Sequence, residues 1–175
     1  MASKSSAPVH DDRVGDESFD RLVAMLDYPM YVVTTQAGGH ASGCLVGFAT
    51  QTSLQPRRFL VGLSRRNHTF GVAARSEHLA VHLLARRHLG LARLFGGQTG
   101  DQINKFERCS WHSGPAGMPI LDDAIAWFVG KTLSRIDLGD HVGYLLEPVA
   151  ATAADRSEAL VSFSDVADLQ PGHEA

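Results

Sequence analysis

The order of hydrophobic and polar residues along the chain predicts mainly β-strands joined by short turns. Runs rich in β-branched and apolar residues occupy 30–35 and 58–64, with a turn expected over 37–40. A longer run over 41–50 is interrupted by Gly43 and Gly47, as expected for a bulge or a close approach of backbone to a ligand. Strict alternation favours another strand over 78–84. Three further strand-like runs follow, over 124–135, 141–150 and 159–163.

Helical segments are expected to be few and short. Apolar residues between 19 and 26 have the i, i+3, i+4, i+7 spacing of one helix face, and Pro29 is expected to end that helix. Asn67 is expected to cap a second short helix, and residues 111–119 to form a Gly/Pro loop. Two more helical pieces are expected, over 87–95 and 101–108. This order of elements favours a mostly β fold, a closed or nearly closed barrel with short α caps.

Length and composition predict one globular domain. The 175 residues suit about one domain, which we place at 16–165 between a flexible tail at 1–15 and a C-terminal tail at 166–175. A hydrophobic content of 44% and a charged content of 20% exclude a disordered or fibrous chain. A net charge of −3 argues against a nucleic-acid partner, and no apolar run is long enough to span a membrane. Two cysteines and a polar N-terminus favour a reduced, cytoplasmic protein.

The distribution of charge points to an anionic small ligand. No acidic residue occurs between 28 and 76, and eight arginines against the single acid Glu77 lie between 28 and 100. Such a stretch raises the local potential, and the planar guanidinium suits phosphate. The alternative is that these arginines are solvated residues of loops and helices.

Several kinds of site are disfavoured. His78 and His82 lie four apart, but in a strand, without the companion ligands of a metal site, so we place both on the less buried face of that strand. The pattern of a nucleophilic serine and the Gly-rich patterns of Rossmann and P-loop nucleotide sites are absent. The remaining candidate comprises the glycine-punctuated segment 43–56 and the segment 63–69, where a basic loop precedes a helix start and resembles an anion site. A plain hairpin and an ordinary helix cap are the alternative.

These segments resemble the flavin reductase-like, FMN-binding split-barrel family. The resemblance rests on YPMYVVTT at 28–35, on the segment 43–56, on Asn67-His-Thr and LAVHLL at 79–84, and on the later elements DQINKF at 101–106, PILD at 119–122 and Gly-Asp-His at 139–141. It covers roughly 19–163. It implies a split β-barrel homodimer that binds FMN (FAD is possible) near the subunit interface and reduces it with NADH or NADPH.

The resemblance also implies roles for individual residues. Backbone beside the isoalloxazine would come from Gly47, Phe48, Ala49, Thr50 and Gln51. The ribityl chain and the phosphate would be held by Thr52, Ser53, Ser64, Arg65, Asn67 and Thr69, while the cap would contribute Lys105 and Phe106. His141 would lie on the nicotinamide side, where an imidazole can orient the nicotinamide or donate a proton at neutral pH; the alternative is a residue that only hydrogen-bonds the barrel rim. We expect no pairing between Asp140 and His141, because neighbours in a strand point to opposite sides.

This sequence departs from the family in one segment. Many members carry Thr and paired Ser where Leu45, Val46, Gly47 and Phe48 stand here, so hydroxyl donors are lost and backbone N–H donors remain. The function implied is an NAD(P)H:flavin oxidoreductase that transfers a hydride from nicotinamide C4 to flavin N5 and supplies a partner monooxygenase. Two alternatives are a module that stores or senses FMN without turnover, and another split-barrel enzyme acting on flavin, deazaflavin or pyridoxamine phosphate.

Overall fold

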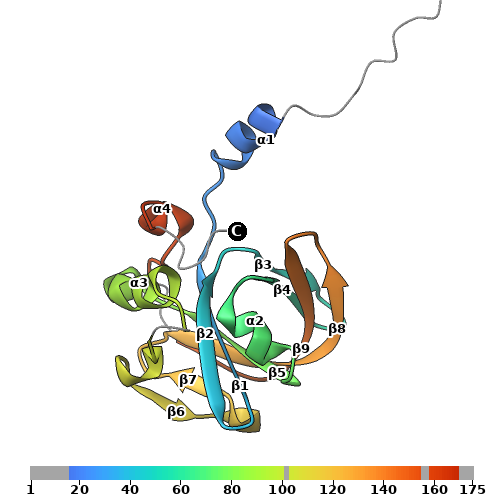
Figure 1. Cartoon of the computed structure of the whole chain (residues 1–175), viewed down its shortest axis with the longest axis vertical. Coiled ribbons are helices and arrows are strands. Elements are labelled where there is room, and N and C mark those ends of the chain that lie inside the picture. The colour runs from blue at the N-terminus through green and yellow to red at the C-terminus, as the bar shows by residue number, and fades with distance from the viewer. Residues whose placement is uncertain (1–15, 101–102, 155–157, 170–175) are drawn as a thin grey trace, which may run out of the picture.

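One antiparallel sheet of seven strands curves round on itself to form the body of the protein (Figure 1). The computed structural model describes residues 16–100, 103–154 and 158–169, so the predicted tail at 1–15 lies outside the described residues. The strand order is β2-β1-β5-β8-β9-β4-β3. The strands are β1 (Tyr31–Ala37), β2 (His40–Val46), β3 (Ala49–Ser53), β4 (Arg58–Ser64), β5 (His78–Leu83), β8 (Ala126–Asp137) and β9 (His141–Ala153).

The barrel is split between β2 and β3. The run predicted over 41–50 is divided at Gly47 into two strands at opposite edges of the sheet, because β2 pairs with β1 while β3 pairs with β4. The turn between β1 and β2 needs the left-handed conformation, which Gly38 (φ +58°) and Gly39 (φ +81°) adopt without a steric penalty. The predicted turn at 37–40 is therefore confirmed, and the chain crosses from one edge of the sheet to the other at residues 47–48.

The inward face of the sheet and the short helix α2 (His68–Ala73) enclose the first hydrophobic core. Helix α2 packs against β1, β2 and β4, and Asn67 caps it as predicted, its Oδ1 accepting from the Thr69 N–H at 2.9 Å. The core consists of buried side chains from five strands and this helix: Val33, Cys44, Val46, Val61, Leu63, Ala73, Leu79, Val81, Val142, Tyr144 and Leu146.

A layer of short elements covers the outer face of β1 and β5. It comprises α3 (Leu89–Gly97), α4 (Phe163–Val166), the 3₁₀ turns Arg86–His88, Lys105–Glu107 (η2) and Pro115–Gly117, and the two-stranded sheet of β6 (Trp111–Ser113) and β7 (Pro119–Leu121). The loop predicted over 111–119 is thus wrong. The segment forms an antiparallel pair because Ala116 and Gly117, both at positive φ, close a tight turn between the two strands.

The strand predicted over 159–163 is also wrong. The segment makes only two isolated bridges, Pro29 to Ser162 and Ala85 to Leu160, before α4 begins. Packing continues beyond residue 165, where we expected the domain to end, because Val166 is buried and Leu169 packs against the same cluster.

His82 is buried, contrary to the prediction that His78 and His82 lie on a less buried face. Its side of β5 is covered by β7, so the imidazole has no access to solvent. Its Nδ1–H donates to the Val32 carbonyl at 3.0 Å, and its Nε2 accepts from the Leu121 N–H at 3.2 Å. Burial lowers the pKa of His82 from 6.5 to about 4, so the ring is neutral and joins β1 to β7.

Helix α1 (Asp16–Val23) stands away from the barrel (Figure 1). It ends well before Pro29, and its apolar residues Phe19 and Leu22 are more than half exposed. Within the described ranges, no helix is both long and apolar enough to cross a bilayer.

Candidate functional site

A cavity of about 170 Å³ lies where the chain crosses the split in the barrel. Its floor is the turn at 47–48, whose N–H groups lie outside the strand pairings, which end at Val46 and resume at Ala49. The cavity is lined by Tyr28, Met30, Cys44, Leu45, Val46, Gly47, Phe48, Gly62, Leu63, Ser64, Asn67, His141 and Phe163. Five of the residues predicted for the site are therefore brought together: Gly47, Phe48, Ser64, Asn67 and His141.

Two close approaches explain why glycine stands at position 47 and again in β4. A Cβ on Gly47 would lie 2.6 Å from Cε2 of Tyr28 and 3.2 Å from Sδ of Met30, so no larger residue fits without movement. A Cβ on Gly62 would lie 3.2 Å from Cβ of Phe48. The Gly62 N–H donates to the Phe48 carbonyl at 2.7 Å and holds the turn against β4. The result is a turn packed tightly between the Tyr28 ring on one side and β4 on the other.

His141 opens β9 at the rim of this cavity, opposite Ser64 of β4. Its ring meets Phe48 edge to face, with the centroids 5.0 Å apart. Its Nδ1 lies 2.7 Å from Oδ1 of Asp140, so the expectation that these neighbours do not pair is wrong. Asp140 lies before the strand begins, where alternation does not apply, and the hydrogen bond from His141 lowers the pKa of its carboxyl. Among the residues that the structure describes, none hydrogen-bonds Nε2 of His141, so that nitrogen can meet a ligand.

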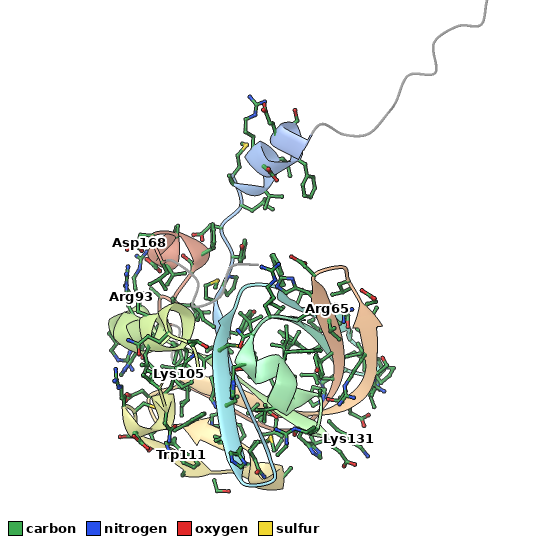
Figure 2. All side chains as sticks on the ribbon, in the orientation of Figure 1. Arg65, Arg93, Lys105, Trp111, Lys131 and Asp168 are labelled. Atoms are coloured by element: carbon green, nitrogen blue, oxygen red, sulfur yellow. The ribbon has the colours of Figure 1, made fainter. Side chains whose placement is uncertain are left out.

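The loop predicted to hold a phosphate presents two of its four candidates to the cavity. Ser64 and Asn67 line it, and Ser64 Oγ also accepts from the Arg66 N–H at 3.3 Å. Thr69 is buried beside the cavity, with its hydroxyl 2.9 Å from Oγ of Ser42. The Arg65 guanidinium turns instead to the β8–β9 turn (Figure 2), donating to the Gly139 carbonyl and pairing with Asp137, each at 3.0 Å.

The other candidates predicted from the sequence lie outside this cavity. Thr50, Gln51 and Thr52 are exposed on the edge strand β3, between the partly buried Ala49 and Ser53. Lys105 and Phe106 belong to η2 and line a neighbouring cavity of about 450 Å³. Their roles toward a flavin remain predictions.

Lys105 is buried and holds two elements together. Only 5% of the residue is exposed, and its Nζ donates to the Gly43 carbonyl of β2 at 3.1 Å and to the Phe95 carbonyl of α3 at 2.9 Å. Burial lowers its pKa from the usual lysine range. The ammonium thus links η2 and α3 to β2, the strand that ends at the split.

The cavity also includes residues that the sequence analysis did not select. Tyr28 and Phe163 stack with their ring centroids 5.1 Å apart at an angle of 18°. Asp27 holds the C-terminal segment beside Tyr28, since its carboxylate accepts from the Ser164 N–H at 2.9 Å and from the Ser162 hydroxyl at 3.0 Å. Tyr28 belongs to one of the recognised motifs. No local signal marks Phe163, which reaches the site from the far end of the sequence.

Replacing Asn67 with alanine is expected to weaken FMN binding about tenfold while riboflavin binding changes little. The amide lines the cavity and orders the loop, and a hydrogen bond to an ionised group contributes roughly 1.5–3 kcal/mol. Loss of the cap should also lower the free energy of unfolding by about 1 kcal/mol. Titration of both flavins by fluorescence quenching measures the difference.

Asn104→Ala is the matched control, because the Asn104 side chain accepts from the Phe106 N–H at 3.1 Å in the same capping role. It should leave the ratio of FMN to riboflavin affinity unchanged. Equal weakening of both flavins by Asn67→Ala would mean that Asn67 only shapes the loop.

Comparison with known proteins places this geometry in context. A family model described as "Flavin reductase like domain" matches residues 23–167. FMN reductase (NADH) RutF 2 of Rhizobium rhizogenes is 30% identical over 158 residues, which cover 90% of this chain and 90% of the relative. The 4-hydroxyphenylacetate 3-monooxygenase reductase component of Pseudomonas aeruginosa is 25% identical, covering 85% of this chain and 88% of the relative.

A solved structure agrees with the fold. The flavin reductase domain protein from Arthrobacter sp. FB24 superposes with a TM-score of 0.76 at 23% identity, covering 85% of this chain and 90% of that chain. The mostly β, split-barrel architecture predicted from the sequence is therefore confirmed.

Proposed function

Because this chain belongs to the flavin reductase-like domain family, we propose that it is an NAD(P)H-dependent flavin reductase that passes reduced flavin to a partner monooxygenase. FMN is the flavin we assign first, with FAD as a second substrate. The observation that carries the proposal is the cavity at the split, where the turn at 47–48, the polar residues Ser64 and Asn67, and His141 converge. Two relatives support it by name, one as an FMN reductase (NADH) and one as the reductase component of a monooxygenase.

The residues around the cavity fit a flavin. The turn at Gly47 and Phe48 packs directly against Tyr28, Met30 and Gly62, and its N–H groups, which lie outside the strand pairings, would hydrogen-bond the polar edge of the ring system. Ser64 and Asn67 would hold the phosphate, and His141 would position the nicotinamide through its free Nε2. A bound flavin supplies the hydride acceptor. The protein supplies binding and orientation, because hydride transfer needs the two rings in contact but no side-chain base.

The decisive experiment combines a binding titration with a turnover assay on the purified protein. FMN should bind about one to one per subunit at tens of micromolar or tighter, roughly −6 kcal/mol, and its absorbance should bleach under excess NADH in the absence of oxygen. Binding without bleaching would favour the alternative of a flavin store or sensor. No binding of either flavin would exclude the proposal.

We also propose that the protein is a homodimer whose second subunit closes the flavin site. A cavity of 170 Å³ is smaller than the roughly 300–1,000 Å³ typical of ligand sites. Large apolar side chains are exposed on the turn at 47–48 and along the end of the β8–β9 hairpin: Phe48, Leu133, Ile136 and Leu138. Symmetric pairing is the commonest way to cover such surfaces.

Light scattering tests the dimer directly. We expect twice the chain mass for the wild type, and the monomer mass, with weaker FMN binding, for the double variant Ile136→Asp with Leu138→Asp. Leu54→Asp, at a more exposed apolar side chain on the β3–β4 turn, serves as the control and should stay dimeric. A monomeric wild type would contradict this part of the proposal.

A cytoplasmic location also remains a proposal. Both thiols, Cys44 and Cys109, are free, as expected for a protein kept in a reducing compartment.

A further inference from the structure

Phe48 places an aromatic ring at the rim of the flavin cavity. The residue lines the cavity, yet 59% of it is exposed, so its ring contributes little to the hydrophobic core. The resemblance implies Thr and paired Ser over positions 45–48 in many members, so an aromatic ring at this position is a departure of this chain. A large exposed side chain in place of a small polar one requires an explanation other than packing.

The backbone that carries this ring is held against β4. The Gly62 N–H donates to the Phe48 carbonyl at 2.7 Å, although the pairing of β3 with β4 begins only at Ala49. A Cβ on Gly62 would lie 3.2 Å from Cβ of Phe48 and 4.0 Å from Cδ2 of His141. A side chain at position 62 would therefore press on Phe48 and also reach His141. Glycine in β4 allows the two rings to stand side by side.

The Phe48 ring is one of two contacts that orient the imidazole of His141. The two ring centroids lie 5.0 Å apart at an angle of 64°, which is an edge-to-face arrangement. The second contact is the hydrogen bond between Nδ1 and Asp140, at 2.7 Å. The χ2 torsion of histidine has broad, roughly two-fold minima, so a ring at the start of a strand depends on its contacts for a single orientation. Asp140 is exposed, and water competes for its carboxylate. The aromatic contact therefore carries much of the orientation.

We propose that Phe48 is a positioning residue for the reaction: its ring fixes the orientation in which the His141 imidazole presents Nε2 to the nicotinamide. The inference rests on the proposed function, because His141 acts there on the nicotinamide side. An aromatic pair of this geometry shifts an equilibrium about two- to tenfold, and misplacing a group at the reacting centre slows a reaction at least as much. Loss of the ring should therefore slow flavin reduction and leave flavin affinity nearly unchanged.

The flavin-free protein provides the first test, by NMR of the histidine side chains. The imidazole signals of His141 are identified by their absence from His141→Ala. Phe48→Ala should shift them, because the field of the neighbouring aromatic ring is lost. Phe19→Ala is the matched control, since it removes a phenyl ring of nearly equal exposure, 58%, from α1 and should leave the His141 signals in place. Unchanged His141 signals in Phe48→Ala would overturn the inference.

The second test is the rate of FMN reduction at saturating NADH, measured by anaerobic stopped-flow. Phe48→Ala should lower this rate about tenfold, while the Kd of FMN changes less than twofold. Phe48→Tyr keeps the ring and should retain most of the rate. Phe48→Leu keeps bulk without an aromatic ring and should resemble Phe48→Ala. A leucine variant as fast as the wild type would contradict a role for the ring.

A double-mutant cycle shows whether Phe48 acts through His141. In the His141→Ala background, Phe48→Ala should change the rate less than twofold, because the group that it orients is already absent. Losses that multiply in the double variant would overturn the inference, since Phe48 would then act independently of His141.

Light scattering separates this role from one in the subunit interface, where Phe48 is also exposed. The Phe48→Ala variant should have the same mass as the wild type, and a fall to the monomer mass in this variant alone would assign the ring to the interface instead. Failure of the proposed function is distinct from these outcomes. It would appear as wild-type protein that does not reduce flavin, and the NMR comparison in the flavin-free protein would still decide whether Phe48 orients His141.

Discussion

Replacing His141 with alanine is expected to slow the reduction of bound FMN by NADH about 100-fold, while the affinity for FMN changes less than threefold. The imidazole lies at the rim of the cavity, held by Asp140 on one nitrogen and by the Phe48 ring on its edge, with Nε2 left for the nicotinamide or for a proton at the flavin. A positioned acid–base group contributes at least about 10²-fold. Anaerobic stopped-flow bleaching of the flavin absorbance, in both proteins, measures the effect.

The Asp140→Asn variant tests whether Asp140 only orients the His141 ring or also contributes to the reaction through its charge. The amide oxygen can still accept from Nδ1–H, so the ring keeps its place while the negative charge beside it is removed. We expect an intermediate loss in rate. Identical bleaching rates in wild type and His141→Ala would leave His141 as a rim residue without a role in the reaction.

Acidification from about pH 7 to pH 4 is expected to lower the free energy of unfolding by up to about 3 kcal/mol through His82 alone. The folded-state pKa is depressed to about 4, whereas the unfolded chain binds the proton near 6.5. The contribution is therefore fully present above pH 6.5 and is lost as the pH falls toward 4, because protons then favour the unfolded chain. One pKa unit corresponds to about 1.4 kcal/mol.

Urea unfolding at several pH values, for wild type and His82→Gln, isolates this group. A glutamine amide has the donor for Val32 and the acceptor for Leu121 but does not titrate. The variant should be less stable near pH 7 and show a shallower decline with acid. Parallel curves for the two proteins would assign the acid sensitivity to other groups.

The strands and the turns were predictable wherever the local pattern determines them. The hairpin at Gly38 and Gly39, the extent of β4 and the cap at Asn67 depend on residues close in sequence, and all three were predicted. The burial of His82 was not predictable in this way, since alternation in β5 cannot show that a separate two-stranded sheet covers its outer face. β6 and β7 themselves are three residues long, too short for a periodic signal.

In the candidate site, too, the features set by local sequence were predictable and those set by long-range contacts were not. Gly47, Ser64, Asn67 and His141 follow from motifs and converge on one cavity. The direction of the Arg65 side chain depends on Asp137 and Gly139, more than seventy residues away, and the pairing of Asp140 with His141 depends on where β9 begins. Phe163 is held at the cavity by contacts with the segment at 27–29, including the Asp27 hydrogen bond to the Ser164 N–H and the Phe163 N–H hydrogen bond to the Tyr28 carbonyl. Such long-range contacts leave no trace in a single sequence.

The contact between Tyr28 and Gly47 makes the identities of these two positions interdependent during evolution. The resemblance implies Thr and paired Ser over positions 45–48 in many members, but the Cβ of a serine at position 47 would come within 2.6 Å of the Tyr28 ring here. Serine at 47 therefore becomes acceptable only in a background where residue 28 is smaller or its ring has moved, which also disturbs the stack on Phe163. The two positions should covary among related sequences. Introducing a serine at position 47 of this chain would therefore require a change at Tyr28 as well.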